Sequence, residues 1–274
     1  MDASASIRFS VRLGMTELAP LHLKQKIDMK HTALITGAAG GLGQAVAEQL
    51  AREGWELVVV GRDADRLQQA FGPAHRQIVA DCSTSEGVRT VFATLKAEQI
   101  QPTALAHCIG NIRLGALHRM SEADFDLCLR ANLISAFHTL AGFVNSLRDA
   151  RSPGAAVLVS SAAARVGTPN HEAIAAAKAG LEGLVRGAAS TYAPAGIRFN
   201  AVAPGMMETP ATAGLISNAT AREAAARQYP LPGIGTPAEL ADLMCWLLSE
   251  RAARVTGQVW SLDGGFSAIR PLVK

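Results

Sequence analysis

Short continuous apolar runs that alternate with helix-length segments are the feature that most constrains the fold of this chain. Two of these runs, Leu57–Val60 and Ala155–Val159, contain no polar residue. Such strands are expected where helices cover both faces of a sheet, whereas a half-exposed strand would alternate polar and apolar residues. Alternating strands and helices indicate repeated βαβ units. The sequence therefore predicts an α/β fold with a doubly wound parallel sheet and helices on both faces.

The predicted order comprises seven strands and six helices. We expect strands near 31–36, 56–61, 76–80, 103–107, 154–160, 196–202 and 258–262, and helices at about 41–53, 63–71, 84–99, 121–148, 170–193 and 237–249. The chain of 274 residues is 49% hydrophobic and has no linker rich in Gly, Ser or Pro, so a single domain over 29–274 is expected. The segment at about 206–235 is the least regular and is placed to act as a lid over a site.

Composition argues against several other classes of protein. The formal net charge is only +3, with scattered basic residues, so nucleic acid is not an expected partner. No uninterrupted apolar run reaches the roughly 18 residues that span a bilayer, so no membrane partner is expected. Residues 1–28 lack the apolar periodicity that starts at His31 and are interpreted as a disordered N-terminal extension.

The cysteines indicate neither a metal site nor a disulfide framework. The chain has four, with no Cys-x-x-Cys pair and no histidine at zinc-finger spacing: Cys82, Cys108, Cys128 and Cys245. They are interpreted as buried thiols in a reducing compartment. The sequence therefore predicts a cytoplasmic protein without a bound metal.

A glycine-rich turn indicates a nucleotide site. Residues 36–43 read Thr-Gly-Ala-Ala-Gly-Gly-Leu-Gly, follow a predicted strand and open a helix. Glycines let the backbone approach a pyrophosphate, whose charge is stabilised by free N–H groups at the helix N-terminus. The second strand ends in Arg62 rather than in a carboxylate, and a guanidinium can pair with a 2′-phosphate. NADP(H) is therefore the preferred cofactor. Because Arg62 could instead be solvated, with Asp63 and Asp65 nearby, NAD(H) stays open.

Over residues 31 to 265 the chain resembles the classical short-chain dehydrogenase/reductase family. The family's Thr-Gly-x-x-x-Gly-x-Gly motif matches at Gly37, Gly41 and Gly43, with Leu42 inside it. The family's Asn-Asn-Ala-Gly has become 107–110, His-Cys-Ile-Gly, which we interpret as weakening a polar network. The resemblance implies a single-domain Rossmann fold and further cofactor contacts: Asp81 and Cys82 at the adenine, Gly110 near the nucleotide, and Pro204, Gly205 and Thr209 at the nicotinamide.

The same resemblance implies a catalytic group from which one member is missing. Ser161, Asn132 and Lys178 match the family's catalytic serine, its water-relaying asparagine and the lysine that holds the nicotinamide ribose. Ile174 stands where the family has its catalytic tyrosine, thirteen positions after Ser161. Isoleucine cannot donate a proton, and loss of a positioned general acid costs about 10²–10⁴ in rate.

His171 is the candidate replacement. It shares one helical face with Ile174 and Lys178 by the three-and-four rule. A neutral imidazole at a helix N-terminus can hydrogen-bond a carbonyl as an electrophile. The alternative is that His171 faces the pocket rim or solvent. Tyr192 lies about fourteen residues beyond Lys178 and is too far away to substitute.

Three functions are compatible with these residues. The first is an NAD(P)(H)-dependent oxidoreductase that transfers hydride between nicotinamide and a carbonyl or alcohol, with an altered proton relay. The second is a nucleotide-binding protein without turnover, and the third is a lyase or isomerase on the same fold. In relatives, helices equivalent to 121–148 and 170–193 pair between subunits, so a homodimer or homotetramer is expected.

Overall fold

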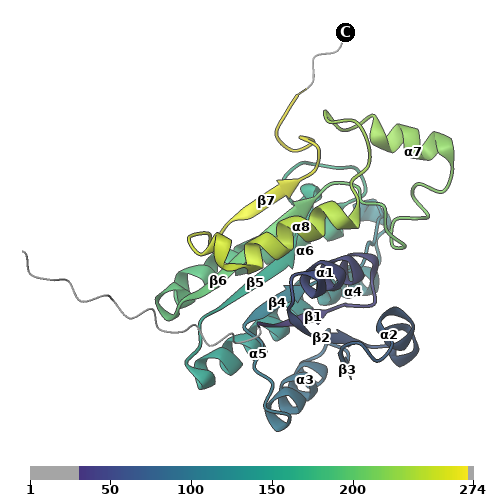
Figure 1. Cartoon of the computed structure of the whole chain (residues 1–274). Coiled ribbons are helices and arrows are strands. Elements are labelled where there is room, and N and C mark those ends of the chain that lie inside the picture. Colours follow the sequence, from purple (N-terminus) through teal and green to yellow (C-terminus); the bar gives the residue numbers. More distant parts are fainter. Residues whose placement is uncertain (1–30, 271–274) are drawn as a thin grey trace, which may run out of the picture.

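Seven strands form one parallel sheet in the order β3-β2-β1-β4-β5-β6-β7 (Figure 1). The computed structural model describes residues 31–270, so the predicted N-terminal extension lies outside the described residues. The strands are β1 Thr32–Thr36, β2 Glu56–Gly61, β3 Arg76–Val79, β4 Ala104–His107, β5 Gly154–Val159, β6 Ile197–Pro204 and β7 Val259–Leu262. The predicted doubly wound fold is confirmed. Strand order reverses between β1 and β4, where ligands bind in sheets of this type.

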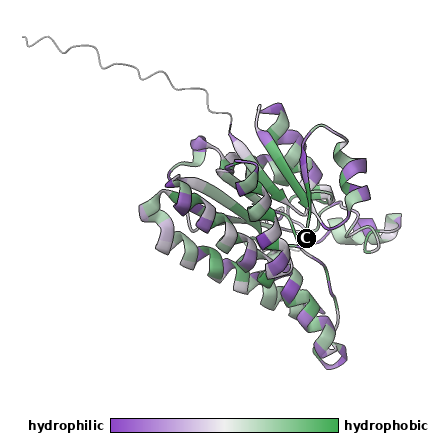
Figure 2. Cartoon of the chain, turned by 90° about the horizontal axis from the view of Figure 1, so that it is seen from below, coloured by the Kyte–Doolittle hydropathy of each residue, from purple (hydrophilic) through white to green (hydrophobic). Residues whose placement is uncertain are grey.

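Helices cover both faces of the sheet. They are α1 Gly41–Arg52, α2 Ala64–Phe71, α3 Ser85–Ala97, α4 Glu122–Leu129, α5 Ser135–Ala150, α6 Glu172–Tyr192, α7 Ala219–Ala226 and α8 Pro237–Leu248. In β1, Leu34 packs in the core beneath α3, α5 and α6, whereas Ala33 and Ile35 pack in the core beneath α1, α2 and α8. Successive residues of one strand therefore enter opposite cores, which explains the continuous apolar runs. Figure 2 shows these hydrophobic strands between helices that carry hydrophilic residues.

The helix predicted at 121–148 is broken in its middle. A π-helix, Arg130–Ile134, separates α4 from α5. Just after it, the Ser135 hydroxyl donates to the carbonyl of Ala131 at 2.7 Å, a bond that competes with the regular helical pattern. Such π-helical turns are frequent at functional sites. Here the turn carries Asn132, which is fully buried.

Two further features differ from the prediction: an additional helix and the start of α6. The segment predicted as irregular, 206–235, contains α7, which the Asn218 side chain caps by accepting a hydrogen bond from the Ala221 N–H. Helix α6 begins at Glu172 rather than near 170, so His171 occupies its N-cap. Asn170 has φ +63°, which is incompatible with the helix continuing backwards.

One described helical stretch, Glu122–Ala150, is long and apolar enough to cross a bilayer by length and composition alone. Several of its side chains, among them Leu140 and Phe143, are buried in the core with the sheet. Packing within the fold therefore accounts for its apolar character.

Candidate active site

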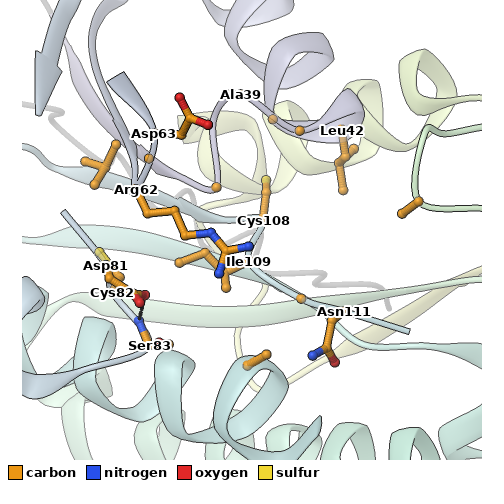
Figure 3. A pocket seen from close by; sticks show the side chains of 18 of the residues that line it. Ala39, Leu42, Arg62, Asp63, Asp81, Cys82, Ser83, Cys108, Ile109 and Asn111 are labelled. Carbon is orange, nitrogen blue, oxygen red and sulfur yellow. Dashed lines mark hydrogen bonds between the residues drawn. The ribbon is translucent and has the colours of Figure 1, made fainter. Parts of the chain in front are cut away.

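A cavity of about 870 Å³ opens at the carboxyl ends of β1, β2, β3 and β4 (Figure 3). Nine of the twelve predicted cofactor residues line it: Gly37, Gly41, Leu42, Gly43, Arg62, Asp81, Cys82, Gly110 and Thr209. The other three lie outside its lining. Pro204 is the last residue of β6, Gly205 follows it, and Lys178 is on α6.

The glycine turn forms a cradle that side chains would fill. Gly37 has φ +70°, and a Cβ there would come within 2.9 Å of the Cys108 backbone. A Cβ on Gly43 would lie 2.5 Å from the Gly37 carbonyl oxygen. The N-cap of α1, Gly40, provides no side chain to bond the N–H groups of the first turn. These N–H groups and the open cradle fit a pyrophosphate.

Two arginines, Arg62 and Arg66, line the part of the cavity beside the end of β2. Arg62 extends into the cavity (Figure 3), and among residues 31–270 its guanidinium forms no hydrogen bond or ion pair. Arg66 donates to the Ala39 carbonyl at 3.3 Å, and the Asp63 carboxylate caps α2 by accepting from the Arg66 N–H. Arg62 is therefore available to bind an anion.

Asp81 faces the same end of the cavity. Burial acts to raise the pKa of this carboxyl, but hydrogen bonds from Ser83 and the charge of Arg62 outweigh it and lower the pKa. Asp81 is therefore a carboxylate at neutral pH. As an acceptor, it suits the amino group or hydroxyls of an adenosine.

Ser161 lies just beyond β5 rather than in it. The strand ends at Val159, and Ser161 is the N-cap of a 3₁₀ helix, Ala162–Ala164. Its Oγ accepts a hydrogen bond from the Ala163 N–H at 3.2 Å. The hydroxyl proton is therefore free to be donated to a substrate oxygen.

Lys178 is a buried cation that has one hydrogen-bond acceptor among residues 31–270. Its side chain is 5% exposed, and Nζ donates to the Val159 carbonyl at 2.7 Å. Burial lowers the pKa of Lys178 to about 8. Burial also raises the pKa of the Cys108 thiol to about 12, so this neighbour is uncharged at neutral pH. No carboxylate in residues 31–270 pairs with the ammonium, which leaves donors for ligand hydroxyls.

Asn132 and Lys178 meet at Gly110. A Cβ at Gly110 would lie 2.8 Å from Asn132 Oδ1 and 3.5 Å from Lys178 Nζ. The Asn132 amide is held firmly, because Nδ2 donates to the carbonyl oxygens of Asn111 and Cys128 at 3.1 and 3.0 Å, while Oδ1 accepts from the Asn111 N–H at 3.3 Å. Gly110 lines the cavity, so both side chains lie next to a lining residue, although neither is itself part of the lining. Asn111 and Cys128 are contacts that sequence reasoning missed.

Neither Ile174 nor His171 forms a hydrogen bond to Ser161, Asn132 or Lys178 among the described residues. Ile174 is 6% exposed and belongs to an apolar cluster with Cys128, Ala173, Ala177, Met120, Phe125 and Leu129. His171 Nδ1 lies 2.7 Å from the Pro169 carbonyl, which can only accept, so Nδ1 carries the proton. The neutral ring then has an unprotonated Nε2.

His107, the first residue of the segment interpreted as weakening a polar network, itself takes part in one. Thr36 and His107 are paired residues of β1 and β4, and Thr36 Oγ1 lies 2.9 Å from His107 Nδ1. His107 Nε2 lies 3.2 Å from Ser135 Oγ. Because the Ser135 proton goes to Ala131, His107 Nε2 must donate and Nδ1 must accept from Thr36. His107 thus links the glycine turn to the π-helix of Asn132.

The ring of His107 stays neutral in this network. Burial and, less strongly, the charge of Lys178 lower its pKa to about 3. Thr36 and His107 end two of the predicted strands, but only the strand order of the sheet brings them together.

Comparison with known proteins matches nearly the whole described domain to dehydrogenases and reductases. A family model described as enoyl-(acyl carrier protein) reductase matches residues 37–267. The cis-4-hydroxycyclohexanecarboxylate dehydrogenase of Sinomonas cyclohexanicum is 36% identical over 248 residues, covering 88% of this chain and 98% of that protein. The A-factor type gamma-butyrolactone 1'-reductase (1S-forming) of Streptomyces virginiae is 34% identical, covering 86% and 95%. A solved short-chain type dehydrogenase/reductase from Mycobacterium ulcerans aligns with a TM-score of 0.82 at 26% identity, over 88% of this chain and 90% of that one.

Proposed function

Because the chain belongs to the classical short-chain dehydrogenase/reductase family of oxidoreductases, we propose that it transfers hydride between NADP(H) and a small-molecule carbonyl or alcohol with an altered proton relay. The observation that carries this proposal is the meeting of Lys178 and Asn132 at Gly110, on the border of the glycine-cradled cavity. A buried ammonium that has one acceptor in the described part of the chain is suited to bind ligand hydroxyls there.

The residues that would hold the cofactor follow the cavity from end to end. Arg62 would bind the 2′-phosphate, and Asp81 with Cys82 the adenosine. Gly37, Gly41, Leu42 and Gly43 would cradle the pyrophosphate. Lys178 would bind the nicotinamide ribose beside Gly110, with Pro204, Gly205 and Thr209 at the nicotinamide. Arg62 supports NADP(H) as the preferred cofactor, and NAD(H) remains the alternative.

Residues of the protein would stabilise the charge that develops on the substrate and supply the proton. The bound nicotinamide supplies or accepts the hydride. The Ser161 hydroxyl, whose oxygen already accepts from Ala163, donates to the substrate oxygen and stabilises its developing charge. Lys178 and Asn132 hold the water that delivers the proton. His171 is the second candidate donor, and it can donate from Nε2 only as the imidazolium, because its neutral form keeps the proton on Nδ1.

Substrate and assembly follow from the same proposal. With Ile174 in place of an acid, oxyanion stabilisation carries more of the rate, which favours activated or conjugated carbonyls. The relatives named above as a dehydrogenase and a reductase support a small carbonyl or alcohol as substrate. We place the enzyme in the cytoplasm as a homodimer or homotetramer.

Calorimetric titration with NADPH and NADH tests the proposal before any substrate is known. Tighter binding of NADPH is expected, because only NADPH carries a phosphate for Arg62. Binding of neither nucleotide would overturn the proposal, since the cradle would then have no nucleotide function.

Nucleotide binding without turnover is the second candidate. The observation that favours it is the burial of Ile174 in an apolar cluster at the position of the general acid. It predicts tight NADPH binding with no carbonyl reduced. One substrate reduced with stoichiometric NADPH consumption would exclude it.

A further inference from the structure

We infer that Glu182 is a positioning residue for Ser161, because one of its carboxylate oxygens fixes both flanks of the segment 160–165. The inference rests on the proposed function, in which the Ser161 hydroxyl contacts the substrate. Sequence reasoning gave Glu182 no role.

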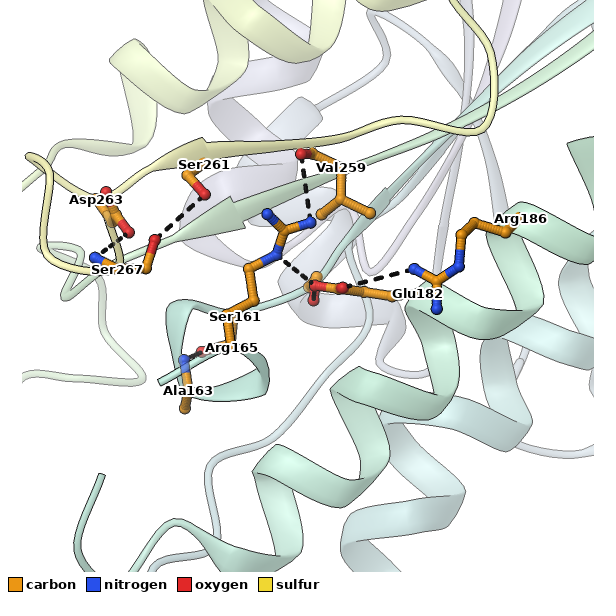
Figure 4. A network of polar contacts seen from close by, with 10 residues as sticks. Ser161, Ala163, Arg165, Glu182, Arg186, Val259, Ser261, Asp263 and Ser267 are labelled. Carbon is orange, nitrogen blue, oxygen red and sulfur yellow. Dashed lines mark hydrogen bonds and ion pairs between the residues drawn. The ribbon is translucent and has the colours of Figure 1, made fainter. Parts of the chain in front are cut away.

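Figure 4 shows the Glu182 carboxylate joined to Arg165 on one side and to Arg186 on the other. Glu182 lies on α6 and is 7% exposed. Its Oε1 accepts from Ser160 Oγ at 2.8 Å and from Arg165 Nε at 3.2 Å. Ser160 immediately precedes Ser161, and Arg165 follows it by four residues. The Glu182 carboxylate therefore binds both ends of the loop that carries Ser161, and so holds this loop against α6.

The sheet holds the same loop from the other side. The Ser160 N–H donates to the Val202 carbonyl of β6 at 2.7 Å, and Arg165 Nη2 donates to the Val259 carbonyl of β7 at 3.4 Å. Within the loop, the Ala164 N–H donates to the Ser161 carbonyl at 3.0 Å. Removing Glu182 leaves these bonds in place but takes away the acceptor of the Ser160 hydroxyl and of Arg165 Nε.

Glu182 also forms its ion pairs with arginines rather than with Lys178. The two residues are four apart on α6, a spacing at which opposite charges can pair on a helix. Glu182 instead pairs with Arg165, and more distantly with Arg186 at 3.9 Å. Among the described residues no ion pair joins Glu182 to Lys178. Arg165 thus orders the Ser161 loop and leaves the Lys178 ammonium to ligands.

Kinetics in two backgrounds tests the inference. A misplacement of about 1 Å at a catalytic group can cost about 10²-fold in rate. We expect Glu182→Ala to lower kcat by about 10- to 100-fold with the NADPH Kd unchanged, and to have no further effect in a Ser161→Ala background. Equal losses in both backgrounds, or no loss in either, would overturn the inference.

Two further variants separate positioning from general damage. Glu182→Gln keeps an acceptor oxygen for Ser160 and should retain more activity than Glu182→Ala; if Glu182→Ala does not fold, the Gln variant carries the same two-background test. Glu98→Ala removes a surface carboxylate paired with Arg76 and should leave kcat unchanged.

Hydrogen exchange provides a readout that needs no substrate. In Glu182→Ala, the amides of Ala163 and Ala164, which bond to Ser161, should exchange faster than in wild type, whereas Glu98→Ala should leave them unchanged. Unchanged exchange in Glu182→Ala would refute the positioning role. If wild type reduces no carbonyl, the proposed function fails, but the exchange measurement still decides whether Glu182 orders the loop.

Discussion

Replacing Ile174 with tyrosine tests whether this site lacks only a proton donor. Ile174 lies on α6 one turn before Lys178, about 6 Å along the helix axis. A cation there would lower the pKa of a phenol and favour proton transfer. A positioned general acid contributes about 10²–10⁴ in rate, equivalent to about 3–5 kcal/mol of transition-state stabilisation. We therefore expect Ile174→Tyr to raise kcat for carbonyl reduction within that range.

The structure also sets the stability cost of this change. Ile174 is 6% exposed and packed in an apolar cluster, so inserting a ring should cost about 1–3 kcal/mol of unfolding free energy. Ile174→Phe is the matched control, because it has the same ring without the hydroxyl. Thermal unfolding and NADPH titration of both variants would measure the packing cost separately from the chemistry.

The assay is NADPH oxidation with a carbonyl substrate, compared among wild type, Ile174→Tyr and Ile174→Phe. The gain of the tyrosine variant over the phenylalanine variant reports the hydroxyl alone. If both variants fold and bind NADPH like wild type, and the tyrosine variant is no faster than the phenylalanine variant, the missing acid does not limit the rate.

Three other perturbations have expected outcomes. Arg62→Ala should weaken NADPH binding by about 10- to 100-fold in calorimetry, as for a lost charge-assisted hydrogen bond, and leave NADH binding unchanged; equal weakening would remove Arg62 as the phosphate ligand. The kcat/KM for NADPH should fall as pH rises above about 8, where Lys178 loses its proton. Lys178→Arg should shift this decline to higher pH, and a pH profile that does not shift would assign the titration to another group. His107 has a pKa of about 3 against an ordinary 6.5, so as pH falls between these values only the unfolded state gains its proton, and the unfolding free energy declines by up to about 1.4 kcal/mol per pH unit. Denaturant unfolding of His107→Asn should lack this part of the decline, and an identical pH dependence would contradict the buried neutral ring.

The sequence was sufficient for the features that depend on local pattern. Strands such as Ala155–Val159 could be predicted because burial on both faces leaves a continuous apolar run. The glycine turn could be placed because Gly37 and Gly43 sit where backbone contacts exclude a Cβ. Both signals are contained in a few consecutive residues.

Features that depend on distant partners were not predicted. His107 bonds to Thr36 across 71 positions, and Glu182 to Ser160 across 22, so neither network is visible in local spacing. The π-helix at Arg130–Ile134 is a small change of helical register that apolar periodicity does not resolve. The face shared by His171 and Lys178 was inferred from ideal helical spacing, but α6 starts only at Glu172, and His171 turns to the Pro169 carbonyl.

Transfer of deuterium from NADPH labelled at the hydride position, followed by mass spectrometry of the product, is the most direct test of the central claim. Incubation with a panel of activated and conjugated carbonyls should yield an alcohol or saturated product that carries one deuterium per NADPH oxidised. Tight NADPH binding without label transfer to any carbonyl, or product formed without NADPH oxidation, would contradict the assignment as an oxidoreductase.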